Sequence, residues 1–463
     1  MGVAEEFRSK TGQPGNSHTV IWYNQPIAEF CFDQSGEILW RGFTDDAYRN
    51  LFRHTPGSDV PQFLVNLLPE NAVFEILDQM KQHQYISSGI RFLSNFRIVS
   101  GSSNDLHAHF ASLGNDYIYG ELSDYTDKQG VFTGVNTAPL PESLDQEALS
   151  NFAAEQWKNR RLPRFSGAEI KIPVHLSEDG ELSISTGLPF THIMKFPVEG
   201  PQAAWGVNEW MCMQLSEAIG LPTPSHAMVP LEGFDWPAYI VERFDITKKP
   251  EGKDTEYLVE QDFCTLCEKQ PKDKDVGSVE SIAKVMKATS EDWPEDREIL
   301  LKRIMLSWLV NDGDMHRKNL SMLYNFNPET NDFTARSAPT YDVTSEIYED
   351  CNFCLTLGGK KIINPKSLTA FATQSLGFSK DEAQNIFNEV YKSINEAAQN
   401  IIHDPPELIE SNPECMHAIG RIVTIVAERS EKMGYEPPEF ERTKRIIPNI
   451  PKRIGQNLPM KYM

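Results

Sequence analysis

The sequence predicts an α+β protein with two lobes, a small β-rich lobe and a large helical lobe, preceded by a β-rich N-terminal subdomain. Two observations support this prediction. Residues 164–246 hold five short strand patterns around one helical pattern, and the chain from Gln261 onward is almost wholly helical in its periodicity. Runs of strands followed by runs of helices are typical of an α+β architecture.

The composition indicates several domains and no broad affinity for nucleic acid. A chain of 463 residues is too long for one compact domain, and 40% apolar residues suffice for real cores. The 66 acidic and 44 basic side chains give a formal charge of -22, which argues against direct binding to a phosphate backbone. Residues 442–463 are an exception, with six Lys or Arg and no Asp or Glu. They either contact an acidic partner or a phosphate backbone, or form a basic tail that packs or frays.

The cysteines and the hydropathy indicate a reducing, aqueous compartment. Seven scattered cysteines argue against a disulfide framework, and the sequence has neither an apolar signal core nor a membrane-length apolar run, so we expect a cytoplasmic protein without membrane contact. Two CxxC pairs, Cys264 with Cys267 and Cys351 with Cys354, have the spacing of a four-thiolate zinc site. The first pair lies in a helical pattern and neither pair has a glycine-rich knuckle, so we do not favour zinc.

The N-terminal part has two segments. Residues 1–17 are polar, rich in Gly and Ser, and expected to be disordered. Residues 18–140 form the N-terminal α+β subdomain, with a hairpin pattern over 19–43 and a helical pattern over 59–80.

Residues 141–163 form a linker with one amphipathic helix near 145–159, and residues 164–246 form the small lobe. The Asp-Gly pair that ends SEDG lies between two alternating runs and predicts a hairpin over 171–185. The other small-lobe elements are a strand at 191–196, a helix at 207–219 that Gly220 ends, and strands at 225–230 and 238–244.

Residues 247–441 form the large helical lobe, and residues 442–463 form the basic C-terminal tail. In the large lobe, apolar residues at helical spacing over 296–310 predict a helix that leads into a polar loop.

Three polar side chains in and after this loop have the spacing that phosphoryl transfer requires. Asp314 and Asn319 stand five apart, as do the catalytic base and a magnesium ligand of protein kinases. Asp342 follows and supplies a second carboxylate for magnesium. The alternative is a solvated turn after a helix, with Asp342 as an ordinary cap.

A small lobe followed by a helical lobe is the order of the protein-kinase fold, and the small lobe offers matching residues. Lys195 is either an edge-strand gatekeeper or the cation that binds phosphates, and Glu209 either pairs with it or complements the helix dipole. Gly167 lies in a turn before the first strand, where kinases cover the phosphates, although the turn lacks the GxGxxG pattern. Residues 241–245 end the last strand, where a hinge presents backbone groups to an adenine.

Several stretches in sequence order resemble the HipA family, the serine/threonine kinase toxins of bacterial persistence modules. They are FSGAEIK, THIMKFP, NEWMCMQLSEAIGLP, YIVERFD, EQDFC, NDGDMHRKN and TYDVTS, and NLLPE at 66–70 is similar to a motif of the family's N-terminal subdomain. The resemblance covers residues 18–430 in outline and implies a bilobal protein-kinase-like fold that uses ATP and Mg²⁺.

The resemblance also implies roles for individual residues. Asp314 is the catalytic base, Asn319 and Asp342 hold magnesium, and Lys195 contacts the ATP phosphates. The further residues implied around the nucleotide are Ser166, Gly167, Glu209, Glu242, Arg243, Phe244 and His316. The backbone of residues 242–244 receives the adenine, and His316 is a structural hydrogen-bonder.

Ser166 is the autophosphorylation site that the resemblance implies, since serine phosphorylation near the glycine-containing loop ejects that loop in the family. Arg164 stands where many members have an earlier serine, so this switch either uses Ser166 or is absent.

The family implies a protein substrate, such as an aminoacyl-tRNA synthetase, and a helix-turn-helix antitoxin of the HipB kind, through which DNA is contacted indirectly. The sequence after NLLPE is longer and less regular than is usual in the family, so these partner contacts have little support from the residues themselves. Two alternatives keep the fold: a small-molecule phosphotransferase, and a non-catalytic module that docks a repressor. The expected catalytic positions are all filled, which argues against the second.

Overall fold

The structure is a computed structural model that describes residues 17–22, 25–32, 38–52, 61, 63, 90–91, 96–101, 119–158, 170–184, 190–200, 203–248, 255–327 and 332–436. Ser17, the last residue of the segment expected to be disordered, belongs to the first strand. The rest of that segment, almost all of the helix expected over 59–80, the NLLPE motif, Ser166 and Gly167, and the basic tail at 442–463 lie outside the described residues.

The N-terminal strands form one antiparallel sheet in the order β3-β2-β1-β5-β4. The strands are β1 (Ser17–Trp22), β2 (Gln25–Phe32), β3 (Ile38–Phe43), β4 (Ile90–Arg91) and β5 (Phe96–Ser100). The strand pattern over 19–43 is therefore confirmed. A short helix that the sequence does not predict, α2 (Asp46–Leu51), follows β3, and the Asp45 side chain caps it by accepting a hydrogen bond from the Ala47 N–H at 2.7 Å.

Aromatic rings fill the core of this subdomain. The rings of Phe52 and Phe63 stack with centroids 3.9 Å apart, and Phe43 stacks on Phe52 at 5.6 Å. The subdomain also contacts the large lobe, because the Gln261 side chain donates to the Leu51 carbonyl at 3.2 Å.

The small lobe is built on a second sheet, in the order β10-β11-β9-β7-β8-β6. Its strands are β6 (Val135–Asn136), β7 (Lys171–Leu176), β8 (Glu181–Ile184), β9 (His192–Lys195), β10 (His226–Val229) and β11 (Ala238–Glu242). The hairpin predicted over 171–185 is confirmed, because β7 and β8 pair antiparallel around Gly180, whose φ is 80°. Glycine adopts this conformation without the steric cost that a side chain would add.

This sheet includes elements that lie before Arg164 in the sequence. β6 comes from the segment 18–140, and it pairs in parallel with β8. The helix expected in the linker is α6 (Gln146–Lys158), and it packs Phe152 against Phe196 with ring centroids 5.7 Å apart. Pairing between segments this far apart leaves no trace in local periodicity, so the sequence alone separates residues that the sheet joins.

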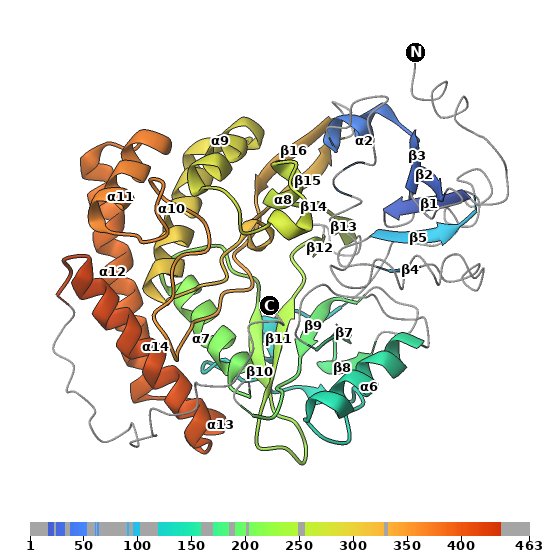
Figure 1. The fold of residues 1–463 in the computed structure, drawn as a ribbon. Coiled ribbons are helices and arrows are strands. Elements are labelled where there is room, and N and C mark those ends of the chain that lie inside the picture. Colours follow the sequence, from blue (N-terminus) through green and yellow to red (C-terminus); the bar gives the residue numbers. More distant parts are fainter. Residues whose placement is uncertain are drawn as a thin grey trace.

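The large lobe is mostly helical, and α7 of the small lobe packs against it. α7 (Trp205–Ala218) matches the helix predicted over 207–219 and contacts β10, β11, α12 and α14. The other helices are α8 (Phe263–Leu266), α9 (Val279–Thr289), α10 (Trp293–Leu309), α11 (Pro365–Ala370), α12 (Lys380–His403), α13 (Glu407–Glu410) and α14 (Pro413–Lys432). Figure 1 shows these helices on one side of the molecule and the N-terminal sheet on the other.

The expectation of an almost wholly helical chain after Gln261 is wrong at the junction of the lobes. A sheet of three antiparallel strands lies there, formed by β14 (Val259–Asp262), β15 (Ser321–Asn327) and β16 (Asp332–Ser337). The pair β12 (Ile246–Lys248) and β13 (Thr255–Tyr257) precedes it. β14 and β15 are about sixty residues apart in the chain, so their pairing depends on tertiary contacts rather than on a local turn signal.

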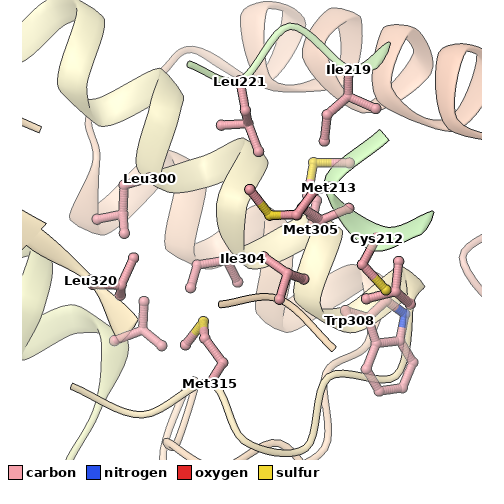
Figure 2. Packing of buried hydrophobic residues seen from close by; sticks show 14 of the residues in the cluster. Cys212, Met213, Ile219, Leu221, Leu300, Ile304, Met305, Trp308, Met315 and Leu320 are labelled. Atoms are coloured by element: carbon pink, nitrogen blue, oxygen red, sulfur yellow. The ribbon is translucent and has the colours of Figure 1, made fainter. Parts of the chain in front are cut away.

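The polar loop after α10 is anchored in the helical core. Met315 of this loop is fully buried, and Figure 2 shows it next to Ile304 of α10 and Leu320. Truncating a buried Met of this kind to Ala costs roughly 2–5 kcal/mol of folding free energy. Met315 therefore anchors a loop whose other residues are mostly polar.

A substitution at Gly277 would show how tightly the segment beside this loop is packed. Its φ is 121°, and an added Cβ would collide with the Arg317 guanidinium. Gly277→Ala should therefore lower the free energy of unfolding by roughly 2–3 kcal/mol through strain and overpacking. Gly359→Ala is the matched control, because Gly359 also has a positive φ, 75°, with nothing near its Cβ position, and should cost only about 1 kcal/mol. Urea unfolding midpoints measure both, and equal shifts would contradict the packing argument.

Candidate active site

Lys195 joins both lobes through ion pairs with Glu209 and Asp342. Its ammonium donates to both carboxylate oxygens of Glu209 on α7, at 2.8 and 2.6 Å, so the pairing considered from the sequence is present. The same ammonium donates to Asp342 Oδ1 at 2.8 Å. Lys195 is 7% exposed and Glu209 2%, which means that neither charge relies on water for its partner.

Asp342 has a strained backbone and a stabilised charge. Its φ is 54°, a left-handed value that is uncommon outside glycine. Burial acts to raise the pKa of its carboxyl, but Lys195 and Lys171 outweigh burial and hold that pKa well below the usual range. Asp342 is therefore an anion at any working pH, as a ligand of a divalent cation must be.

Asp314 and Asn319 lie on one turn of the loop. The Asn319 side-chain amide donates to the Asp314 carbonyl at 3.0 Å, and the Asp314 N–H donates to Asp312 Oδ1 at 3.2 Å. Asn319 is buried, whereas the Asp314 side chain is 66% exposed. The Asp314 carboxylate is thus open to solvent, whereas the Asn319 side-chain amide is buried and fixed by its hydrogen bond to the Asp314 carbonyl.

The environment of Asp314 raises the pKa of its carboxyl to about 7. Desolvation by the surrounding chain is the largest cause, and the negative charge of Asp312 is the next. Lys274 opposes these effects, while Asp342 and Asp275 add to them. Water on the exposed side weakens each contribution, but the direction suits a group that exchanges a proton near neutral pH.

His316 lies next to this carboxylate and is neutral. Its Nε2 is 3.9 Å from Asp314 Oδ1, and the ring is 7% exposed. Burial lowers the pKa of His316 to about 4, with Lys274 acting in the same direction. Within the described residues, Nδ1 has no hydrogen-bond partner.

Hydrogen bonds within the protein fix the backbone of the predicted hinge at residues 242–244. The amides of Glu242 and Arg243 donate to the carbonyls of Ser225 and Thr191, at 2.8 and 2.9 Å. The Arg243 side chain is buried and donates twice to Asp245, at 3.0 and 2.8 Å. These bonds fix the end of β11 and leave Phe244 as the hinge residue whose amide no described backbone carbonyl accepts.

Residues 164–398 match the family model described as the HipA-like C-terminal domain. The chain belongs to the HipA family. This match runs from the start of the small lobe into α12, so it contains every described site residue above.

Two curated relatives of this HipA-like chain carry names that describe them as candidate kinases. One is from Haemophilus influenzae, with 25% identity over 216 residues, or 44% of this chain and 60% of the relative. The other is Y4dM of Sinorhizobium fredii, with 27% identity over 177 residues, or 33% of this chain and 40% of the relative. The chain therefore matches 60% or less of the length of either relative.

One solved structure shares the fold over nearly the whole chain. It is HipA of Shewanella oneidensis, solved in complex with HipB and operator DNA. The TM-score is 0.57 with 16% identity, and the match covers 90% of this chain and 100% of that one. The HipA-like chain therefore has the bilobal kinase-like fold expected from its sequence.

Two asparagines that the sequence reasoning did not single out hold the site of this HipA-like chain together. Asn208 on α7 forms a two-way clamp with Ser345, accepting from its N–H at 2.8 Å and donating to its carbonyl at 2.7 Å. Asn311, with a φ of 62°, donates to the Glu349 carbonyl at 2.7 Å and accepts from the Cys351 N–H at 3.2 Å. The quoted motifs contain both residues, but side-chain amides carry no signal in periodicity.

Two buried arginines brace the same loop. Arg317 donates to the Val276 carbonyl at 3.0 Å and to Ser281 at 2.8 Å, which places residues 274–281 against the loop. Arg429 of α14 donates to the Trp308 carbonyl at 2.6 Å and also to Asn311. The C-terminal helix of the described chain thus supports the start of the loop.

The four CxxC thiols have separate partners. Cys264 donates to the carbonyls of Lys269 and Gln270, and Cys267 accepts from Arg317 at 2.9 Å. Cys351 donates to Asn311, and Cys354 donates to Asp275 at 3.3 Å. Among the described residues, no group of three or more His, Cys, Asp or Glu side chains is placed to hold a metal ion. The described part of the chain also contains no helix long and apolar enough to cross a membrane.

Replacing Asp314 by Asn tests the shifted pKa. The native state holds a proton on this carboxyl up to about pH 7, whereas the unfolded chain loses it near pH 4. The native state is therefore favoured at low pH, and this contribution is lost as pH rises from about 4 to 7. The melting temperature of Asp314→Asn relative to wild type should thus rise across that window, by roughly 2–5 °C, and stay constant above it.

Asp332→Asn, which removes a carboxylate at the exposed start of β16, serves as the control. A difference between Asp314→Asn and wild type that is the same at pH 5 and pH 8 would contradict the assignment.

Proposed function

We propose that this chain is an ATP- and magnesium-dependent kinase that transfers the γ-phosphoryl group to a serine or threonine hydroxyl of a protein. The observation that supports this most directly is the meeting of Lys195, Glu209 and Asp342 beside the loop that carries Asp314 and Asn319. These residues are the five positions at which a kinase needs a cation, its partner, a base and two oxygen ligands. Membership of the HipA family supports the same conclusion.

The donor set suits Mg²⁺ and a nucleotide triphosphate. Magnesium prefers oxygen ligands, and Asp342 offers a carboxylate that is an anion, while Asn319 uses its amide nitrogen on the Asp314 carbonyl and keeps its amide oxygen for a cation. Bound Mg²⁺-ATP supplies the phosphoryl group and neutralises the charge on its phosphates. At the hinge predicted over Glu242, Arg243 and Phe244, the Phe244 amide is the one left to bind adenine, and Ser166 and Gly167 would lie over the phosphates.

Each of these residues would have a separate role in phosphoryl transfer. Lys195, kept charged and oriented by Glu209, would place its ammonium against the phosphates. Asp314 would orient the acceptor hydroxyl and take its proton, for which a pKa of about 7 is favourable. His316, neutral and buried, would support the loop rather than carry the proton. Positioning and electrostatic stabilisation provide most of the acceleration in this type of reaction.

Asp314→Ala should lower turnover by more than about 100-fold, equivalent to roughly 3 kcal/mol of barrier, because the acceptor hydroxyl loses its base. Transfer from radiolabelled ATP to lysate proteins measures this, and Asp332→Ala is the matched control that should retain activity. Intact mass after incubation with Mg²⁺ and ATP gives a second readout, in which wild type gains one phosphate mapped to Ser166 and Asp314→Ala gains none.

Transfer to small metabolites but not to proteins would favour the phosphotransferase alternative. ATP binding without any transfer would favour a non-catalytic module. Wild-type turnover by a folded Asp314→Ala protein would remove Asp314 from the mechanism.

We also propose that the chain binds a helix-turn-helix antitoxin of the HipB kind and reaches DNA only through it. The Shewanella oneidensis HipA structure contains HipB and operator DNA, and a formal charge of -22 disfavours direct binding to DNA. The chain alone should not retard an operator duplex in a mobility-shift assay at about 150 mM salt, whereas a co-expressed complex with such an antitoxin should retard it. Retardation by the chain alone would contradict the proposal.

A further inference from the structure

The small-lobe sheet has a seam where one segment changes neighbours. At Val131 this segment runs parallel to β10, since the Phe132 N–H donates to the Met228 carbonyl at 2.8 Å and the Met228 N–H donates to the Gly130 carbonyl at 2.9 Å. Four residues later the same segment pairs with β8 instead, and the Val135 N–H donates to the Gly180 carbonyl at 2.9 Å. The segment therefore bridges the two ends of the sheet.

Pro230 explains why the pairing with β10 stops. The next bond of a parallel ladder would run from residue 230 to the Phe132 carbonyl, but proline has no N–H. No described bond joins Gly134 to Pro230 either, so the two strands separate after Phe132.

The separated strands enclose a groove of about 620 Å³. Its lining comes from both sides of the seam and consists of Phe132, Gly134, Val135, Asn136, Thr137, Ala138, Leu140, Val229, Pro230, Leu231 and Glu232. Val135 is 62% exposed, which is high for a β-branched residue in a sheet. The groove is far larger than a water site, and its volume matches a few amino-acid residues.

One wall of the groove is an unpaired strand edge. Residues 135 and 137 donate to the carbonyls of Gly180 and Leu182 on the β8 side. Because alternate residues of a strand point their amides to opposite sides, the backbone groups of Gly134 and Asn136 face the groove. In the described structure these amides have no backbone acceptor, and such an edge is a template for an added strand.

The groove carries negative charge. Glu232 lines it, and the Glu181 carboxylate accepts a hydrogen bond at 2.8 Å from Thr137, which also lines it. The lining residues include no Lys or Arg. A basic side chain in the occupant would therefore complement the rim.

We propose that this groove binds a short extended segment of a partner protein, with β-branched residues and a flanking lysine or arginine, as a strand added to the edge at Gly134 and Asn136. The backbone of the partner pairs with the edge, its apolar side chains pack on Val135 and the partly buried Leu140, and its basic side chain faces Glu232. This docking site is separate from the candidate active site and adds a partner contact to the proposed function without depending on it.

The probe is a fluorescein-labelled peptide GKVTVKG, measured by fluorescence anisotropy against the full chain. We expect saturable binding with a Kd on the order of 100 μM. Asn136→Pro removes one edge donor while leaving the β8 bonds of residues 135 and 137, and should weaken binding about fivefold. Glu232→Lys should weaken it by a similar factor, whereas Glu217→Lys, a matched charge change on the exposed face of α7, should not.

A peptide N-methylated at alternate amides should fail to bind, since it cannot form the added strand. The proposal is overturned by an absence of saturable binding, by equal binding of the N-methylated peptide, or by equal binding to the Glu232→Lys variant. A further arm uses an unlabelled peptide that copies residues 442–452 of this chain. Displacement of the probe by that copy at concentrations lower than unlabelled GKVTVKG requires would assign the groove to the chain's own tail and overturn the partner assignment.

Discussion

The ion pairs of Lys195 are the constraint on which the site depends. A buried ammonium must have anionic partners within hydrogen-bond reach, because leaving it unpaired costs several kcal/mol. Its two partners come from different elements: Glu209 from α7, and Asp342 from the segment after β16. The Lys195 ammonium thus links β9, α7 and the segment after β16. Replacing such a charge network with apolar residues is often neutral for stability, so folding stability alone does not explain this arrangement.

The polar loop around Asp314 would not hold its shape through backbone pairing alone. Asn311 and Asp342 both have left-handed φ values, 62° and 54°, which cost of order 1–3 kcal/mol each and persist only where the surroundings determine them. Side-chain amides supply that determination, with Asn208 bonded to both backbone groups of Ser345 and Asn311 bonded to the segment after it. Met315 and Arg429 connect the loop to the core and to α14. Desolvation by this rigid surrounding chain is the main cause of the raised pKa of Asp314, and the negative charge of Asp312 adds to it.

In the small lobe, Lys195 and the seam lie in different parts of the sheet. Lys195 lies at the end of β9 in the middle of the sheet, whereas the seam lies where residues 130–136 pass from β10 to β8. Pro230 ends the ladder between residues 130–132 and β10, because proline lacks the N–H donor that the next hydrogen bond needs. Gly134 is also restricted, since a Cβ there would collide with the Gly180 carbonyl oxygen. The missing N–H of Pro230 and the missing side chain of Gly134 therefore determine the backbone path at the seam.

The sequence by itself determined the parts that depend on local order. The spacing of Asp314 and Asn319, the periodicity of 207–219 and the Asp-Gly turn before β8 each specify a local element, and the structure contains all three. Tertiary structure alone decided what depends on residues far apart in the chain: the sheet of β14, β15 and β16, the pairing of β6 with β8, and the clamps of Asn208 and Asn311. A strand partner or an amide hydrogen bond between positions about 40 to 140 residues apart has no period and no turn residue to reveal it, because register is fixed by burial and pairing in space.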